Sequence, residues 1–275
     1  LMDRWLINGL QAESLPVEDR GLHYGDGLFE TMACRDGRIR LLDKHLQRLR
    51  LGCQRLQLPT DFISALTEDI DNIVAGESYG TLKLIVTRGS GQRGYAPPAS
   101  PQLTVIMGFS AAVAEPVSYA RVRFCRTPIG RNESLAGIKT LNRLEQVLAR
   151  AEWDGSDPFD EGLMINDRGE VVCGTMSNLF VIKDQLLLTP RLNECGVLGV
   201  MRSHIMELAA CLNIEVREDA FNQADVLAAD TVFLTNALKG IWPVETIEGM
   251  TLGTSDLLTR LQAELNESFG MGRAS

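Results

Sequence analysis

Hydrophobic positions change period along the chain, and these changes predict strands alternating with helices in its first third. Apolar side chains recur at helical spacing from Leu42 to Leu56, and Leu58-Pro59 ends this pattern. The helices are predicted at 42–56 and 61–75. Strands are predicted at the short apolar runs 4–6, 27–34, 82–87 and 103–108. A loop rich in glycine, proline and serine, residues 88–101, is long enough to favour a functional role.

Strand signals lie closer together in the second part of the chain. Strands are predicted at 121–126, 162–165, 170–173, 178–182, 185–189, 231–235 and 242–247, and helices at 141–153, 199–212, 222–228 and from 255 onward. Such clustered strands with segregated helices predict an α+β fold class. Residues 111–116 are small and carry one charge, Glu115. We therefore predict a small N-terminal domain at 1–112, a linker at 113–118 and a larger domain at 119–275.

Charge and composition exclude several functional classes. Lys and Arg number 27 against 36 Asp and Glu, and the net charge of −9 disfavours nucleic acid and anionic membrane surfaces as partners. No run reaches the roughly 18 apolar residues of a membrane helix. Charged residues interrupt the N-terminal segment, so we expect a cytoplasmic protein. Six scattered cysteines and three distant histidines predict neither a metal site nor a disulfide framework.

Two features carry candidate chemistry. Lys139 has apolar neighbours on both sides, and a lysine in a dry pocket has a lowered pKa and a nucleophilic amine. Surface exposure is the commoner state of a lysine. Gly196 and Gly199 precede a predicted helix whose first amides, those of Val200 and Met201, suit a phosphate. The same glycines are also compatible with simple close packing. A phosphate loop and an activated lysine are together the minimum requirement for pyridoxal 5′-phosphate.

Several segments resemble the fold-type IV pyridoxal-phosphate family, which includes branched-chain and D-amino-acid aminotransferases and aminodeoxychorismate lyases. The similar segments are Gly21–Thr31, His45–Leu49, Gly137–Val147, Ser177–Phe180, Gly199–Arg202 and Asn236-Ala237. The resemblance implies a two-domain homodimer whose larger domain is a strand-rich pseudo-barrel flanked by helices. It implies that Lys139 forms the Schiff base with pyridoxal 5′-phosphate. Residues that it implies for the cofactor phosphate are Arg48, Val200, Met201, Asn236 and Ala237.

Within the family, three segments resemble the lyases more than the aminotransferases. They are Arg88–Tyr95, Lys139–Gln146 and Asn236–Val244. The implied reaction converts 4-amino-4-deoxychorismate to 4-aminobenzoate and pyruvate, a step of folate biosynthesis. Because this substrate has two carboxylates, Arg88 and Arg93 are candidate clamps, and Tyr24, Phe29 and Tyr95 are candidate walls for its ring. The alternatives are an aminotransferase of D- or branched-chain amino acids and a phosphate-ligand binding protein without catalysis.

One position departs from the family pattern. Counting back from Ser177, Cys173 occupies the place where the family usually has a glutamate that keeps the pyridine nitrogen protonated. A neutral thiol does not stabilise a pyridinium as a carboxylate does. We therefore predict that Cys173 lies at the cofactor and that the cofactor is a weaker electron sink here.

Overall fold

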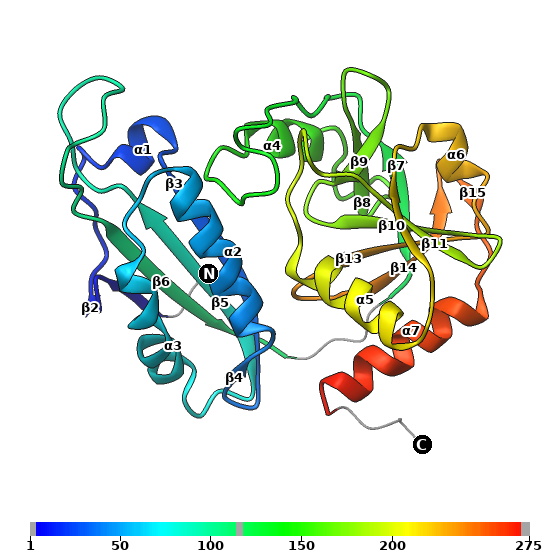
Figure 1. Ribbon diagram of the computed structural model, residues 1–275, viewed down its shortest axis with the longest axis horizontal. Helices are drawn as coiled ribbons and strands as arrows, with labels where there is room; N and C mark the ends of the chain where they lie inside the picture. The colour runs from blue at the N-terminus through cyan, green and yellow to red at the C-terminus, as the bar shows by residue number, and fades with distance from the viewer. Residues whose placement is uncertain (1–3, 114–117, 271–275) are drawn as a thin grey trace. The chain divides into compact units, whose positions relative to one another are not determined.

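The computed structural model describes residues 4–113 and 118–270 (Figure 1). Contacts divide the chain into two compact units: unit 1 comprises residues 1–115 with 138–142, and unit 2 comprises 116–137 with 143–275. Most of the predicted linker, residues 114–117, lies outside the described residues. The predicted domain boundaries stay a prediction, and the assignment of residues 138–142 to unit 1 was not foreseen.

Unit 1 is built on a six-stranded sheet in which every neighbouring pair is antiparallel. Its elements are β1 (Arg4–Ile7), β2 (Leu10–Gln11), α1 (Arg20–Tyr24), β3 (Gly27–Arg35), β4 (Arg38–Ile39), α2 (Leu42–Arg55), the 3₁₀ turn η1 (Asp61–Ser64), α3 (Leu66–Val74), β5 (Tyr79–Thr87) and β6 (Thr104–Ala111). The strand order is β2-β1-β6-β5-β3-β4. The long ladder between β3 and β5 places their side chains in fixed register, from Gly27 opposite Thr87 to Arg35 opposite Tyr79.

Helix α2 packs against β3, as Figure 1 shows for the left-hand unit. Its buried residues, His45, Leu49, Gly52 and Cys53, are spaced at four, three and one positions and so form one face. A Cβ atom on Gly52 would lie 2.7 Å from a methyl carbon of Leu28, so glycine permits the close approach of helix and strand. This approach brings the polar side chains of His45 and Arg48 on α2 within hydrogen-bond distance of Glu30 on β3.

Unit 2 is built on a nine-stranded mixed sheet with four helices. Its elements are β7 (Ala120–Phe124), α4 (Leu144–Arg150), β8 (Glu161–Ile165), β9 (Val171–Gly174), β10 (Asn178–Lys183), β11 (Leu186–Pro190), α5 (Val200–Cys211), β12 (Val216–Asp219), α6 (Gln223–Leu227), β13 (Thr231–Asn236), β14 (Gly240–Ile247), β15 (Met250–Thr251) and α7 (Asp256–Ser268). The strand order is β12-β11-β10-β13-β14-β7-β8-β9, and β15 pairs with β14. Parallel pairs are β11/β12, β14/β7 and β7/β8.

The sheet of unit 2 curls around one apolar core. Val171 of β9 and Leu179 of β10 belong to the same buried cluster although their strands lie toward opposite ends of the strand order. Helices α5 and α7 lie side by side and in contact (Figure 1). The predicted α+β class and strand-rich second domain are therefore confirmed. Within the described ranges, no helix has the length and apolar character to cross a membrane.

Candidate active site

Lys139 lies on a short segment that pairs with the edge of β3. The Phe29 N–H donates to the Lys139 carbonyl oxygen at 3.0 Å, and the Leu141 N–H donates to the Gly27 carbonyl oxygen at 3.0 Å. The Lys139 Nζ lies 4.3 Å from the centroid of the Phe29 ring. Backbone pairing thus fixes the lysine on the strand that carries one of the predicted substrate-binding aromatics.

A second lysine contacts the same ring. The Nζ of Lys83, on β5, lies 3.7 Å from the Phe29 centroid. Burial lowers the pKa of Lys83 to about 8, although the charge of Glu30 acts in the opposite direction. Sequence reasoning missed Lys83. The signal was present, because the apolar neighbours that singled out Lys139 are matched here by Leu82 and Leu84.

Arg48, the predicted phosphate ligand, is held by a buried carboxylate on β3. Its Nε donates to Oε1 of Glu30 at 2.8 Å, and its Nη2 donates to Oε2. His45 Nδ1 lies 2.6 Å from the same Oε2. Burial opposes ionisation of Glu30, but the charge of Arg48 and these hydrogen bonds outweigh it and lower the pKa of Glu30 to about 2. Glu30 and His45 stand within the family-like motifs but were not assigned a role from the sequence.

The cluster around Glu30 has an excess of positive charge. Burial lowers the pKa of His45, against the opposing effect of Glu30, so the imidazole is neutral. Arg48 bonds to Glu30, Lys83 and Lys139 both lie on the Phe29 ring, and the charges of Glu30 on Lys83 and of Lys139 on His45 link these groups electrostatically. In a chain of net charge −9, this is a concentrated cationic site suited to anions.

Arg88, a predicted carboxylate clamp, has a structural environment. Its Nε and Nη2 donate to Asp26 at 2.8 and 3.0 Å. Its other bonds go to the carbonyl oxygens of Leu56 at 2.7 Å and Gln57 at 3.3 Å, and the residue is buried. Four of its five N–H groups are thereby used. These contacts do not support substrate binding by Arg88, because its guanidinium already joins Asp26 to the end of α2.

Arg93, Tyr24 and Tyr95 lie on or beside the loop that follows β5. Arg93 is exposed, and Tyr95 is 87% exposed. The Tyr24 and Tyr95 rings are 5.4 Å apart, and the Tyr24 hydroxyl accepts the Gly94 N–H at 3.1 Å. The structure therefore brings the two tyrosines together.

Buried Arg20 shapes this loop and was missed from the sequence. Its guanidinium donates to the carbonyl oxygens of Gly94 and Tyr95 at 2.9 and 3.1 Å, and to Asp26 at 2.8 Å. The backbone of the loop is therefore tied to α1, whereas Arg93 keeps an exposed side chain.

In unit 2, helix α5 begins with an open first turn. Val200 and Met201 are its first residues, and no side chain within the described ranges caps the helix. Asn178 shapes the approach to it: Nδ2 donates to the Val197 carbonyl oxygen at 2.9 Å. A Cβ atom on Gly199 would lie 1.9 Å from Asn178 Oδ1. The glycine is thus required by close packing, and that packing sets the position of the helix N-terminus.

The second predicted phosphate contact is the turn after β13. Asn236 Oδ1 accepts the N–H groups of Leu238 and Lys239 at 3.0 and 2.9 Å. The Asn236 side chain therefore builds the turn that presents Ala237. One residue earlier, the Thr235 hydroxyl is buried and has no hydrogen-bond partner in the part of the chain that the structure describes. A polar ligand at this turn would satisfy such a group.

Cys173 is buried on β9, opposite Met164. It belongs to an apolar cluster that includes Cys125 and Cys195. Burial, assisted by Cys195 and Glu161, raises the pKa of the Cys173 thiol to about 12. The thiol is therefore neutral, as the sequence argument requires. Its position at the cofactor stays a prediction.

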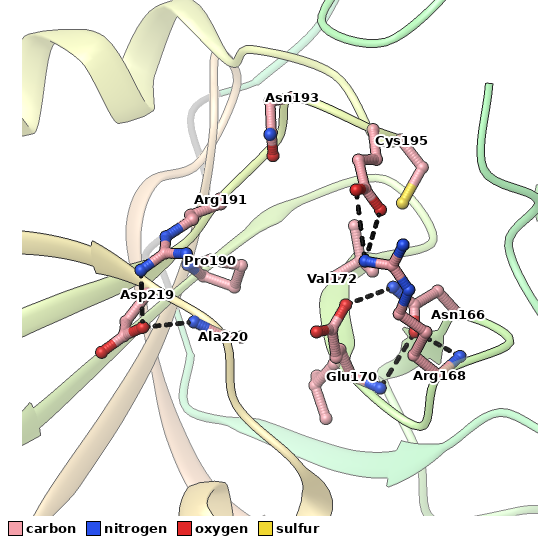
Figure 2. A pocket seen from close by; sticks show the side chains of 12 residues that line it. Asn166, Arg168, Glu170, Val172, Pro190, Arg191, Asn193, Cys195, Asp219 and Ala220 are labelled. Atoms are coloured by element: carbon pink, nitrogen blue, oxygen red, sulfur yellow. Dashed lines mark hydrogen bonds and ion pairs between the residues drawn. The ribbon is translucent and has the colours of Figure 1, made fainter. Parts of the chain in front are cut away.

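Unit 2 has a pocket of about 100 Å³ beside this apolar cluster, since Val172 and Cys195 line it (Figure 2). None of the predicted site residues lines it. Both of its arginines are paired: Arg168 contacts Glu194 at 3.0 Å, and Arg191 contacts Asp219 at 3.0 Å. Figure 2 shows Arg168 and Arg191 on opposite sides of the opening. Because both arginines are paired with carboxylates of the same pocket, this pocket is a poor candidate for binding an anionic cofactor.

Comparisons with known proteins agree with this arrangement. The model of the amino-transferase class IV family matches residues 27–247. The chain belongs to the amino-transferase class IV family. It is 34% identical to an aminodeoxychorismate lyase of Vibrio harveyi over 94% of this chain and 98% of that protein. It is 28% identical to a D-alanine aminotransferase of Bacillus licheniformis over 90% of both.

A solved structure is similar throughout. The crystal structure of 4-amino-4-deoxychorismate lyase from Pseudomonas aeruginosa is 43% identical, with a TM-score of 0.91, and the match covers 96% of this chain and 98% of that one. This confirms the expected fold-type IV architecture of a class IV protein.

The residues of this class IV protein fit pyridoxal 5′-phosphate. The uncapped first turn of α5 offers N–H donors and the positive end of a helix dipole, which suit a phosphate. Arg48 supplies a guanidinium fixed by Glu30, and Lys139 supplies an amine. The unsatisfied Thr235 hydroxyl adds a buried polar atom that lacks a partner within residues 118–270. Each unit thus has groups that suit this cofactor: an amine and a guanidinium in unit 1, and backbone N–H donors in unit 2.

Proposed function

We propose that the protein is a pyridoxal 5′-phosphate-dependent lyase that converts 4-amino-4-deoxychorismate to 4-aminobenzoate and pyruvate, a reaction of folate biosynthesis. The observation that carries the proposal is the cationic cluster of Lys83, Lys139 and Arg48 around Glu30. A substrate with two carboxylates and a cofactor with a phosphate both need such charge. Relatives named as aminodeoxychorismate lyases support the choice of reaction.

The chemistry divides between cofactor and protein. When bound, pyridoxal phosphate supplies an electron sink. Lys139 has two tasks: its amine attaches the cofactor, and it serves as the general base that removes the proton at C4 of the substrate. The C3–O bond then breaks, the electron pair leaves with the enolpyruvyl oxygen, and the ring becomes aromatic. The released enolate takes up a proton at its methylene carbon and becomes pyruvate, so no oxidant is needed.

Phosphate binding is assigned to residues of both units. In unit 1, Arg48 provides a planar fork of donors. In unit 2, the backbone N–H groups of Val200 and Met201 open α5, and Ala237 lies in the turn built by Asn236. These groups hold the cofactor in place without taking part in the proton transfer.

Substrate binding is assigned to unit 1. Lys83 and Arg93 are the proposed partners of the two carboxylates, since Lys83 lies beside Lys139 on the Phe29 ring and Arg93 is exposed on the loop. Phe29, Tyr24 and Tyr95 provide aromatic surface for the substrate ring. Arg88 is left out of this set because its contacts are structural.

The test is a direct assay of the two possible reactions. Purified protein with bound cofactor is given 4-amino-4-deoxychorismate, and 4-aminobenzoate and pyruvate are measured. We expect the two products in equal amounts. A parallel reaction supplies an amino acid and a keto acid. Amino-group transfer without 4-aminobenzoate would establish the aminotransferase alternative, and the absence of both reactions together with no borohydride-trapped adduct at Lys139 would favour a binding protein.

We infer that the protein works as a homodimer in the cytoplasm. On α4, Leu144, Val147 and Leu148 are 77%, 59% and 60% exposed, and their spacing forms one apolar stripe. An equivalent stripe on a second copy would cover it. Sedimentation should show a dimer that Leu148→Glu converts to monomer, whereas Met250→Glu, at another exposed position of unit 2, should leave it intact. A monomeric wild-type protein would contradict the inference.

A further inference from the structure

Glu30, His45 and Arg48 form a hydrogen-bonded group within unit 1. Both oxygens of the Glu30 carboxylate accept from Arg48, through Nε and Nη2. A two-point bond of this kind fixes the plane of a guanidinium as well as its position. Glu30 therefore sets the direction in which the guanidinium of Arg48 points.

His45 fixes the carboxylate in turn. It lies three residues before Arg48 on α2, so both side chains project from the same face of the helix toward β3. His45 Nδ1 lies 2.6 Å from Glu30 Oε2. The ring is buried and neutral, so Nδ1 carries the hydrogen that Glu30 accepts, and His45 adds no second cation beside Arg48. The carboxylate is thereby held against rotation from one side by a neutral donor.

This arrangement has an energetic reason if Arg48 binds a phosphate. A guanidinium that must find its orientation pays side-chain entropy on binding, and one that is already fixed does not. Loss of either support would leave the Arg48 charge present but misdirected.

We propose that Glu30 is a positioning residue that directs Arg48 toward the cofactor phosphate, and that His45 is the positioning residue that holds Glu30. The proposal rests on the phosphate role of Arg48 in the proposed function, but not on the identity of the reaction. If Glu30 and His45 position Arg48, substituting them must weaken only ligands that carry the phosphate. A structural ion pair would affect all ligands alike.

The test compares two ligands that differ only in the phosphate. Dissociation constants for pyridoxal 5′-phosphate and for pyridoxal are measured with the cofactor-free protein from the absorbance of the imine at Lys139. In the wild-type protein we expect much tighter binding of the phosphorylated ligand. Glu30→Gln should weaken its binding by at least about tenfold, with little change for pyridoxal. The ³¹P chemical shift of the bound phosphate should move as well.

Two variants of His45 provide a second test, which does not alter the buried carboxylate of Glu30. His45→Leu removes the donor and should weaken pyridoxal phosphate selectively, whereas His45→Asn places an amide N–H near the position of Nδ1 and should restore binding. Glu77→Gln is the matched control, since Glu77 pairs with Arg4 at 2.6 Å near the surface of the same unit. It should change neither constant.

Three results would overturn the proposal. They are an equal loss for both ligands in the Glu30 and His45 variants, no loss for either ligand, and an undiminished effect of Glu30→Gln in a protein that already carries Arg48→Leu. The assay for 4-aminobenzoate is read separately. A protein that binds pyridoxal phosphate selectively but forms no 4-aminobenzoate would refute the proposed reaction and leave this inference standing.

Discussion

Unit 1 and unit 2 are prepared for an anion in different ways. In unit 1, Arg48 bonds to Glu30, Lys83 and Lys139 lie on the Phe29 ring, and burial lowers the pKa of Lys83. In unit 2, the corresponding feature is the uncapped start of α5, which offers backbone N–H groups. Backbone N–H groups do not titrate near neutral pH, and among side-chain substitutions only proline removes one. We therefore expect anion binding by unit 1 to be sensitive to changes of charge, and anion binding by unit 2 to changes of shape.

The largest effect is expected in unit 1 at Lys139. Lys139→Arg keeps the positive charge but removes a nucleophilic amine that can lose its proton. We expect 4-aminobenzoate formation to fall by about 10³-fold or more, with no borohydride-trapped adduct. Lys183→Arg, at an exposed lysine on β10, is the control and should behave as the wild type. A Lys139→Arg variant with an unchanged rate would show that another residue is the base.

A charge inserted into unit 2 tests how its apolar cluster responds to a carboxylate. Cys173→Glu places a carboxyl group in the apolar cluster, and we expect the cofactor-free protein to lose about 3 kcal/mol of unfolding free energy at pH 7. Burial raises the pKa of such a carboxyl, so the loss should shrink as the pH falls and the group becomes protonated. Denaturant unfolding measures both.

The cofactor separates a site residue from a core residue at this position. If Cys173 faces the pyridine nitrogen, bound pyridoxal phosphate should recover part of the stability of Cys173→Glu and change its absorption spectrum and turnover. Cys195→Glu, in the same cluster, should show the destabilisation without the recovery. Identical behaviour of the two variants, or unchanged spectrum and turnover, would remove Cys173 from the cofactor site.

A change of shape in unit 2 should have the next largest effect. Gly199→Ala forces a Cβ atom against Asn178 and displaces the start of α5. Overpacking of this kind costs about 1–3 kcal/mol, and we expect cofactor affinity to fall by about 10- to 100-fold. Gly155→Ala is the control, because no atom lies within 4 Å of its Cβ position. Equilibrium dialysis against pyridoxal phosphate decides between unchanged and weakened binding.

The smallest effect concerns the pH dependence that unit 1 owes to Lys83. Its pKa of about 8 means that the ammonium is lost as the pH rises through 8. If Lys83 binds a substrate carboxylate, kcat/KM should fall above pH 8. The fall should be less than about tenfold, because only one partly exposed ion pair is lost. Lys83→Arg should keep its charge and move the fall to higher pH.

Stability should respond to Lys83 with the opposite sign. The folded protein binds this proton less tightly than the unfolded chain, whose pKa is near 10.5, so unfolding free energy should rise between pH 8 and 10.5. This contribution should disappear in Lys83→Met. A pH profile of kcat/KM that is the same in wild type and Lys83→Arg would exclude Lys83 from substrate binding.

Local patterns were sufficient for much of the fold. The predicted helix at 199–212 and strand at 178–182 correspond to α5 and β10, because their apolar periods are those of the elements themselves. The five-residue helix α1 and the short β12 were not predicted. Elements of this length contain too few positions to show a period, and β12 is largely exposed.

The candidate site was harder to predict where it depends on contacts between distant residues. Lys139 could be singled out from its neighbours, but Glu30 joins Arg48 across eighteen positions and from another element. Arg88 resembled a loop cation and is buried against Asp26, sixty-two positions away. Nothing in the local sequence distinguishes a guanidinium that binds a ligand from one that binds a carboxylate of its own chain.

The position of residues 138–142 also determines how the protein can be divided. A fragment that ends near residue 115 would contain every strand of the first sheet but would lack the segment that pairs with Gly27 and Phe29. Its β3 would then present unpaired backbone groups at one edge, a common cause of aggregation. We therefore expect neither half of the chain to fold stably when produced alone, because Lys139 lies in the second half of the sequence but belongs to unit 1 by its contacts.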